Sequence, residues 1–346
     1  MKGSITSMIR HRRILVTALA AGLVLLTSIP GRSDSGGVPN ENAKGYWTQD
    51  RMNRAIAIEL VVDENTGIGR IQPAAGARGG GSTSKTSSSK TILSTTDWPQ
   101  GSPIAQTAVG KVYFTVGTIP YVCSGALMKE NDSSRAVVLT AAHCVWDQAS
   151  GSFVTNWAFR PDHDSNANNP IWYASALVLR NEFASQTTFN TTALLNDWAF
   201  AVILPNSSDS RNPSNVLPDN AGANAYQYLS SGFAAGKTSF AYGYPQASPF
   251  NGATLKYAGA TIFVDPNTKG TWGMNSSMTG GASGGPWLSH PTSQSGTEYG
   301  LTGSLSSVNS YKYNKDSTKM YGPFFNARTD ATRNAALTAT TNTRVS

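Results

Sequence analysis

The chain of 346 residues is poor in cysteine, histidine and charged side chains. Charged residues make up only 14% of it and apolar residues 39%, which excludes a chain kept unfolded by its own charge. Two cysteines and four histidines leave no close-spaced ligand cluster, so we expect no metal site. No run beyond the N-terminal region is apolar for long enough to cross a bilayer.

The one long apolar run lies near the N-terminus. Arg10-His11-Arg12-Arg13 precedes the apolar residues 14–26, and small or turn-forming residues follow as far as Ser33. This order is typical of a secretory signal peptide, so we expect residues 1–33 to be removed and the protein to be extracellular or periplasmic. An uncleaved membrane anchor, which would make this a cell-surface protein, is the alternative. After signal removal we expect no stable membrane association.

The net charge of +7 raises the question of nucleic-acid binding. Part of this charge lies in the N-terminal region, and the remaining Lys and Arg are scattered without a basic stripe or interleaved aromatics. We expect a mildly basic secreted surface and no nucleic-acid partner.

The next part of the chain changes composition sharply. A polar stretch with one apolar segment, residues 55–62, leads into the Gly/Ser-rich run 76–90, which cannot bury apolar surface. We expect residues 34–95 to be a propeptide with a cleavable linker at 76–90, and residues 96–346 to be the functional domain. A permanent N-terminal extension is the alternative.

Beyond residue 109, short strand-like runs alternate with turn signals. Two groups of such runs, separated by the polar passage 205–224, predict an all-β fold of two packed antiparallel β-barrels. A short C-terminal helix is expected near 328–338. In an exported chain the isolated pair Cys123 and Cys144 predicts one disulfide.

Three residues stand out as candidates for chemistry. His143 follows an apolar strand and precedes Cys144, Asp197 begins another apolar strand, and Ser283 lies in Gly280-Gly281-Ala282-Ser283-Gly284-Gly285-Pro286. A catalytic serine needs an exposed hydroxyl and backbone N–H groups directed at the developing oxyanion, and glycines permit both. Each residue alone also fits a structural role: a strand-end histidine, a solvated turn acid or a plain glycine turn.

Together these motifs, in the order His143, Asp197, Ser283, resemble those of the chymotrypsin-like (trypsin-like) serine peptidases. The resemblance spans about residues 109–327, and Cys123 and Cys144 resemble the cysteine pair that brackets the family's histidine. It implies a double β-barrel in which His143 is the general base, Asp197 orients it and Ser283 forms the acyl-enzyme. It also implies an oxyanion hole from the N–H groups of Gly281 and Ser283.

Other consequences follow from the same resemblance. The mechanism needs no cofactor, the partners are protein or peptide substrates, and we expect a monomer.

Gly281-Ala282-Ser283-Gly284-Gly285 also matches the Gly-x-Ser-x-Gly pattern of α/β-hydrolases. That fold is excluded because it needs an acid and then a histidine after the serine, and no acid lies between Ser283 and His290. A catalytically inactive binding module on the same barrels is the alternative function.

Departures from the family pattern concern activation and specificity. Ala282 stands where most animal members have an acid that pairs with the new N-terminus, so the chain is more similar to the bacterial, glutamyl-endopeptidase-like branch. By the same similarity, Ser277 marks the base of the substrate pocket, where a trypsin-like carboxylate is missing. Ser306 is the candidate for backbone pairing with substrate. The preferred substrate side chain stays open.

Overall fold

The structure is a computed structural model that describes residues 45–73, 95–98, 103–128, 135–164, 171–203, 227–228, 234–289 and 304–346. The predicted signal peptide, the linker 76–90 and the passage 205–224 lie outside these residues. None of the helices in the described ranges has the length and apolarity needed to cross a membrane.

The first group of strands carries long apolar runs that are buried almost throughout. In β6, for example, Ala136–Thr140 are all buried, as expected of a short apolar run in a sheet interior. The group comprises β4 (Val109–Val116), β5 (Ile119–Leu127), β6 (Ala136–Thr140), β9 (Thr155–Pro161), β10 (Trp172–Tyr173), β11 (Ala176–Arg180) and β12 (Ala199–Ile203). They pair antiparallel as β10–β9–β4–β5–β6–β12–β11, and the short C-terminal strand β22 (Thr343–Val345) adds to β11 in parallel.

The second group lies later in the chain and divides into two sets. One set contains β13 (Gln227–Tyr228), β14 (Thr238–Gly243), β15 (Lys256–Thr261), β18 (Pro286–Ser289), β19 (Ser304–Val308) and β3 (Thr96–Asp97). The other contains β16 (Phe263–Val264), β17 (Thr271–Asn275), β20 (Tyr311–Tyr313) and β21 (Asp316–Pro323). The two groups of antiparallel strands confirm the predicted all-β class and its division into two parts.

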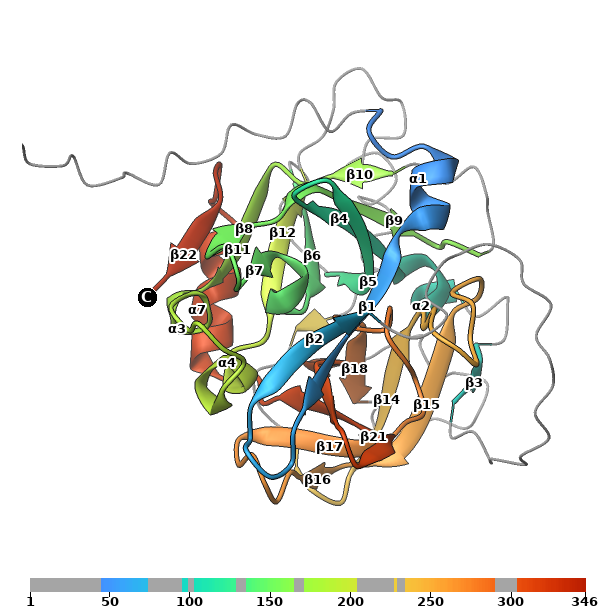
Figure 1. The fold of residues 1–346 in the computed structure, drawn as a ribbon, viewed down its shortest axis with the longest axis vertical. Coiled ribbons are helices and arrows are strands. Elements are labelled where there is room, and N and C mark those ends of the chain that lie inside the picture. Colours follow the sequence, from blue (N-terminus) through green and yellow to red (C-terminus); the bar gives the residue numbers. More distant parts are fainter. Residues whose placement is uncertain are drawn as a thin grey trace, which may run out of the picture. The chain divides into compact units, whose positions relative to one another are not determined.

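The strand β1 (Ile56–Val62) was not expected to belong to this framework. It pairs in parallel with β5 at one end and with β20 at the other, and antiparallel with β2 (Gly69–Pro73). In Figure 1 these two blue strands pass from the green strands of the first group to the orange and red strands of the second. Part of the predicted propeptide therefore connects the two groups through backbone hydrogen bonds.

Helices are few and short in the described residues. They are α1 (Gln49–Arg54), α2 (Pro103–Ala108), α3 (Asn181–Ala184), α4 (Thr191–Leu195) and α7 (Ala327–Ala336), with a 3₁₀ turn at Ala142–Cys144 and the small ribbon β7 (Trp146–Asp147)–β8 (Ser152–Phe153). Helix α7 agrees with the expected C-terminal helix. It begins at a capping box in which Asn326 and Thr329 satisfy each other's backbone N–H groups.

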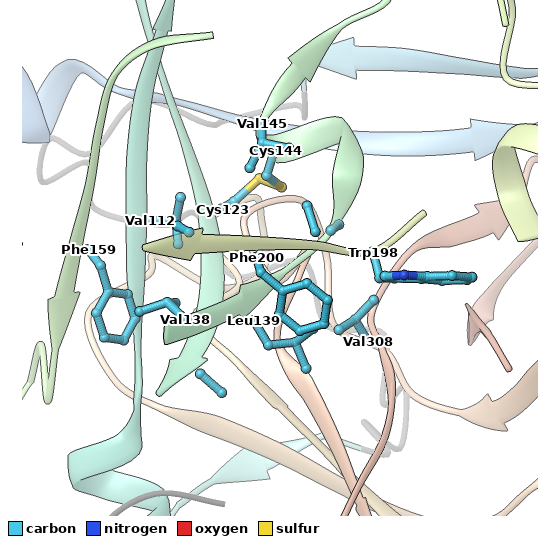
Figure 2. Close-up of a cluster of buried hydrophobic side chains, with 14 of the residues drawn as sticks. Val112, Cys123, Val138, Leu139, Cys144, Val145, Phe159, Trp198, Phe200 and Val308 are labelled. Atoms are coloured by element: carbon cyan, nitrogen blue, oxygen red, sulfur yellow. A yellow bond between two sulfur atoms is a disulfide. The ribbon is translucent and has the colours of Figure 1, made fainter. Parts of the chain in front are cut away.

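The largest buried cluster surrounds the disulfide between Cys123 and Cys144, and Figure 2 shows the two sulfur atoms beside Val145, with Phe200 and Leu139 near Val308. Both cysteines are fully buried, and the pairing predicted from the sequence is present. The bond ties the middle of β5 to the turn after β6. These are the elements that position the candidate base.

Candidate active site

His143 is held in place by its two chain neighbours. Ala142–Cys144 forms a single 3₁₀ turn directly after β6, and the disulfide from Cys144 fixes this turn to β5. His143 has only 3% of its surface exposed. The imidazole therefore has one orientation, set by the end of an apolar strand.

Asp197 supplies the partner that a buried histidine needs. It lies between α4 and β12, and none of its surface is exposed. One carboxylate oxygen accepts the backbone N–H of His143 at 2.9 Å, and the other lies 2.8 Å from Nδ1 of the same residue. Nδ1 therefore carries the proton that faces Asp197, and this tautomer leaves the Nε2 lone pair free. Nε2 is buried and has no hydrogen-bond partner among the described residues.

A third donor to Asp197 was missed by the sequence interpretation. The Ser310 hydroxyl donates to Oδ2 at 2.5 Å, and Ser310 is itself buried. It precedes β20 and is 113 residues from Asp197 in the chain. The run from Ser304 to Ser310 contains several hydroxyls, and no local signal distinguishes the one that contacts the acid.

Ser283 lies in a turn packed against the middle of β5 and the end of β6. Its carbonyl oxygen accepts the Ser124 N–H at 2.7 Å and lies 3.9 Å from Cys144 Sγ, so its backbone sits beside the disulfide next to His143. Gly284 has φ +80°, and a Cβ there would lie 2.2 Å from Thr140 Oγ1. The glycine is required because the turn approaches the strand that leads to His143. No hydrogen bond joins the Ser283 hydroxyl to Nε2, a bond that in such sites commonly tightens when substrate binds.

Gly281, the predicted oxyanion donor, also has a left-handed backbone, with φ +97°. Its N–H donates to the carbonyl oxygen of Ile58 in β1 at 3.2 Å, and its own carbonyl accepts the Ser124 hydroxyl at 2.8 Å. The donor predicted to bind a substrate oxyanion is thus directed at a backbone carbonyl of the N-terminal segment.

The two predicted pocket residues differ in their placement. Ser277 donates its N–H to Thr95 Oγ1 at 3.1 Å, and its own hydroxyl is buried without a hydrogen-bond partner. Ser306 donates to the Trp287 carbonyl at 3.1 Å from within β19, which already pairs with β18 and β13. The pairing with β13 covers only Ser304 and Leu305, and the pairing with β18 shifts register beside Ser306, so the role of Ser306 toward substrate stays a prediction.

The other described histidine and acids are placed away from this arrangement. Burial and the positive charges of Lys111 and Arg160 lower the pKa of His163 to about 2, so it is neutral at physiological pH. Asp162 and Asp164 accept hydrogen bonds from Gln106 rather than from His143. His11 and His290 lie outside the described residues.

Within the described ranges, one cluster of residue types that bind metals occurs, at Cys123, His143 and Cys144. Both sulfur atoms are used by the disulfide, so they cannot act as thiolate ligands. The cluster is therefore a by-product of the disulfide's position next to His143.

One family model and a number of solved structures match this chain. The family model of the lysyl endopeptidase C-terminal domain matches residues 94–201, a range that includes His143 and Asp197. A comparison with curated proteins found no significant match.

Solved structures provide longer matches. The protease Anisep from Arthrobacter nicotinovorans is 33% identical over 71% of this chain and all of its own, with a TM-score of 0.56. The thermostable serine protease AL20 from an extremophilic microorganism is 31% identical over 68% of this chain and all of its own, also with a TM-score of 0.56. A Glu endopeptidase in complex with MPD is 18% identical over 70% of this chain and 95% of its own, with a TM-score of 0.50, which supports the fold alone.

Proposed function

The chain belongs to the chymotrypsin-like serine peptidases, and we propose that it is secreted as a precursor and cleaves peptide bonds through an acyl-enzyme on Ser283. The observation that carries this assignment is the buried contact between His143 Nδ1 and Asp197 Oδ2, at 2.8 Å. It holds the tautomer whose free Nε2 can accept the proton of a serine hydroxyl.

In the proposed reaction, Ser283 Oγ attacks the substrate carbonyl carbon while His143 Nε2 takes the hydroxyl proton. The charge that develops on the carbonyl oxygen is stabilised by the N–H groups of Gly281 and Ser283. His143 then gives its proton to the leaving amine, and a water molecule, activated in the same way, hydrolyses the acyl-enzyme. Asp197 stabilises the imidazolium throughout, and Ser310 holds one oxygen of that carboxylate.

The proposed precursor consists of a signal peptide at 1–33, a propeptide at 34–95 and a peptidase domain at 96–346. In support, the family match begins at residue 94, and the solved relatives are covered completely by about seven-tenths of this chain. Extracellular localisation rests on the signal-like N-terminus and remains part of the proposal.

The test is covalent labelling with a fluorescent phosphonofluoridate, which reacts with activated serines. N-terminally processed protein is expected to incorporate one label, located on Ser283 by peptide mapping, and to hydrolyse casein. Ser283→Ala and His143→Ala proteins should fold but incorporate none. Processed wild-type protein that neither takes the label nor hydrolyses casein refutes the proposal and favours the inactive binding module.

A further inference from the structure

The N-terminal segment, defined here as residues 45–73, is built into the described structure next to the candidate catalytic residues. Ile56 and Ala57 pair in parallel with Tyr121 and Val122, immediately before the disulfide cysteine Cys123. Further along the same strand, Leu60–Val62 pair in parallel with Tyr311–Tyr313, immediately after Ser310. The strand therefore runs from the elements that hold His143 to those that hold Asp197.

Between these two pairings, the segment contacts the groups that the proposed reaction needs. The Ile58 carbonyl occupies the Gly281 N–H, and the Ile58 side chain lines a cavity of about 480 Å³ together with His143. Residues 68–71, at the start of β2, line the same cavity. With the segment in place, His143 is only 3% exposed and Ser283 only 6%.

Contacts along its whole length hold the segment. Trp47 Nε1 donates to the Asn156 carbonyl at 2.7 Å, and Gln246 Nε2 donates to the Ala55 carbonyl at 2.9 Å. Gly69 N–H donates to the Phe189 carbonyl at 2.8 Å. The side chains of Leu60 and Val62 are fully buried in a cluster with Leu194, Tyr311, Tyr313 and Tyr321. Such burial is typical of a docked element rather than of a tail in solution.

Two residues of opposite charge lie on the paired strands β1 and β20, Glu59 on the first and Lys312 on the second. Glu59 is half-buried; burial raises its pKa, and the charge of Lys312 opposes that rise. Lys312 is 3% exposed, and its Nζ donates to the Ser317 carbonyl at 2.7 Å and to the Ser276 carbonyl at 3.4 Å, next to the candidate pocket residue Ser277. Two negative charges favour the charged form of Lys312: that of Glu59 from the N-terminal segment and that of Asp316 from β21.

We propose that the N-terminal segment is an intramolecular inhibitor: β1 fills the groove between β5 and β20, and its Ile58 carbonyl occupies the Gly281 N–H. Peptidase activity then requires hydrolysis of one peptide bond between Pro73 and Thr95, followed by departure of the segment. This inference rests on the proposed function, because an inhibitor implies an active site to block.

The experiment uses the precursor with a recognition sequence for an unrelated endopeptidase inserted between Gly81 and Ser82. The intact precursor is expected to hydrolyse casein at less than about one-tenth of the rate of the same protein after cleavage and removal of the segment by gel filtration. An intact precursor as fast as the processed protein overturns the inhibitor.

Glu59→Lys tests the docking of β1, because it places a like charge near Lys312 on the paired strand β20. The matched control, Asp50→Lys, changes an exposed acid whose ion pair, with Arg54, lies within the N-terminal segment itself. The intact Glu59→Lys precursor is expected to hydrolyse casein about tenfold or more faster than the intact Asp50→Lys precursor. Equal rates overturn the role of Glu59 in docking the segment.

After cleavage and removal of the segment, both variants leave the same processed protein. They should then match wild type, which shows that the domain folded in each case. Failure of the proposed function has a different signature: processed wild-type protein without phosphonofluoridate label or casein hydrolysis. That result refutes both proposals, whereas an active processed enzyme with an equally active precursor refutes the inhibitor alone.

Discussion

The substitution Asp197→Asn tests the proposed role of the buried acid with almost no change in shape. The carboxylate accepts three hydrogen bonds: the His143 backbone N–H at 2.9 Å, His143 Nδ1 at 2.8 Å and the Ser310 hydroxyl at 2.5 Å. An asparagine replaces one accepting oxygen by an NH₂ group, which can only donate. It therefore has two possible orientations in the site.

If the amide nitrogen faces the backbone N–H, two donors oppose each other in a site with no exposed surface, which costs about 1–3 kcal/mol. If it instead faces Nδ1, it can donate both to that nitrogen and to the Ser310 oxygen, whose hydroxyl can rotate. The second orientation is favoured, and it makes Nδ1 an acceptor. The ring proton then moves to Nε2, where no base remains for Ser283.

We expect kcat of the processed Asp197→Asn enzyme to fall by about 10⁴, the loss found for the equivalent change in the family's template enzyme. At about 1.36 kcal/mol for each tenfold change, this is a barrier higher by about 5.4 kcal/mol. The assay is hydrolysis of a chromogenic peptide, with thermal unfolding measured alongside. Asp330→Asn, in helix α7, is the control and should keep full activity. An Asp197→Asn enzyme within tenfold of wild type would show that another group orients His143.

Three further predictions concern residues that position the site. Ser310→Ala should lower kcat/KM by about tenfold or more, since a hydrogen bond to a charged group contributes about 1.5–3 kcal/mol. The control Ser306→Ala, which removes only a hydroxyl bound to the Trp287 carbonyl, should leave kcat/KM unchanged. Equal effects of the two substitutions would contradict the role given to Ser310. Gly284→Ala should prevent folding or lower the melting temperature strongly, because its Cβ would meet Thr140 Oγ1 at 2.2 Å. A Cβ at Gly117 would have no atom within 4 Å, so Gly117→Ala should lower the free energy of unfolding by about 1–3 kcal/mol from backbone strain alone. Calorimetry distinguishes the two outcomes. Reduction of the disulfide, whose cysteines are 21 residues apart, should lower the free energy of unfolding by about 3 kcal/mol in urea titrations, and an unchanged transition would show that the bond does not constrain the unfolded chain.

Local patterns were sufficient for much of the framework. Buried apolar runs such as 136–140 and 199–203 become β6 and β12, and the C-terminal helix begins one residue before the predicted start. These elements could be predicted because their apolar residues and turn signals are adjacent in the chain. The cysteine pair could be predicted because it has only one possible partner arrangement.

The site could be predicted where its candidate residues lie in short, recognisable sequence motifs. The sequence alone named His143, Asp197 and Ser283 as the candidates, and the structure places the first two in direct contact. Ser310 was missed because a row of serines does not show which hydroxyl contacts an acid 113 residues away. Ser306 was named for another role, backbone pairing with substrate. Hydrogen bonds between distant segments depend on strand pairing, which composition does not encode.

From the sequence by itself came the fold class, the disulfide and the order of the three candidate residues, since each depends on neighbouring side chains. Only the tertiary structure decided where residues 56–62 lie. An apolar strand in a predicted propeptide can pair with any open sheet edge. Its pairing with Tyr121 on one side and Tyr311 on the other follows from the groove that the two strand groups leave between them. The N-terminal segment became a candidate inhibitor because this groove passes Gly281 and His143.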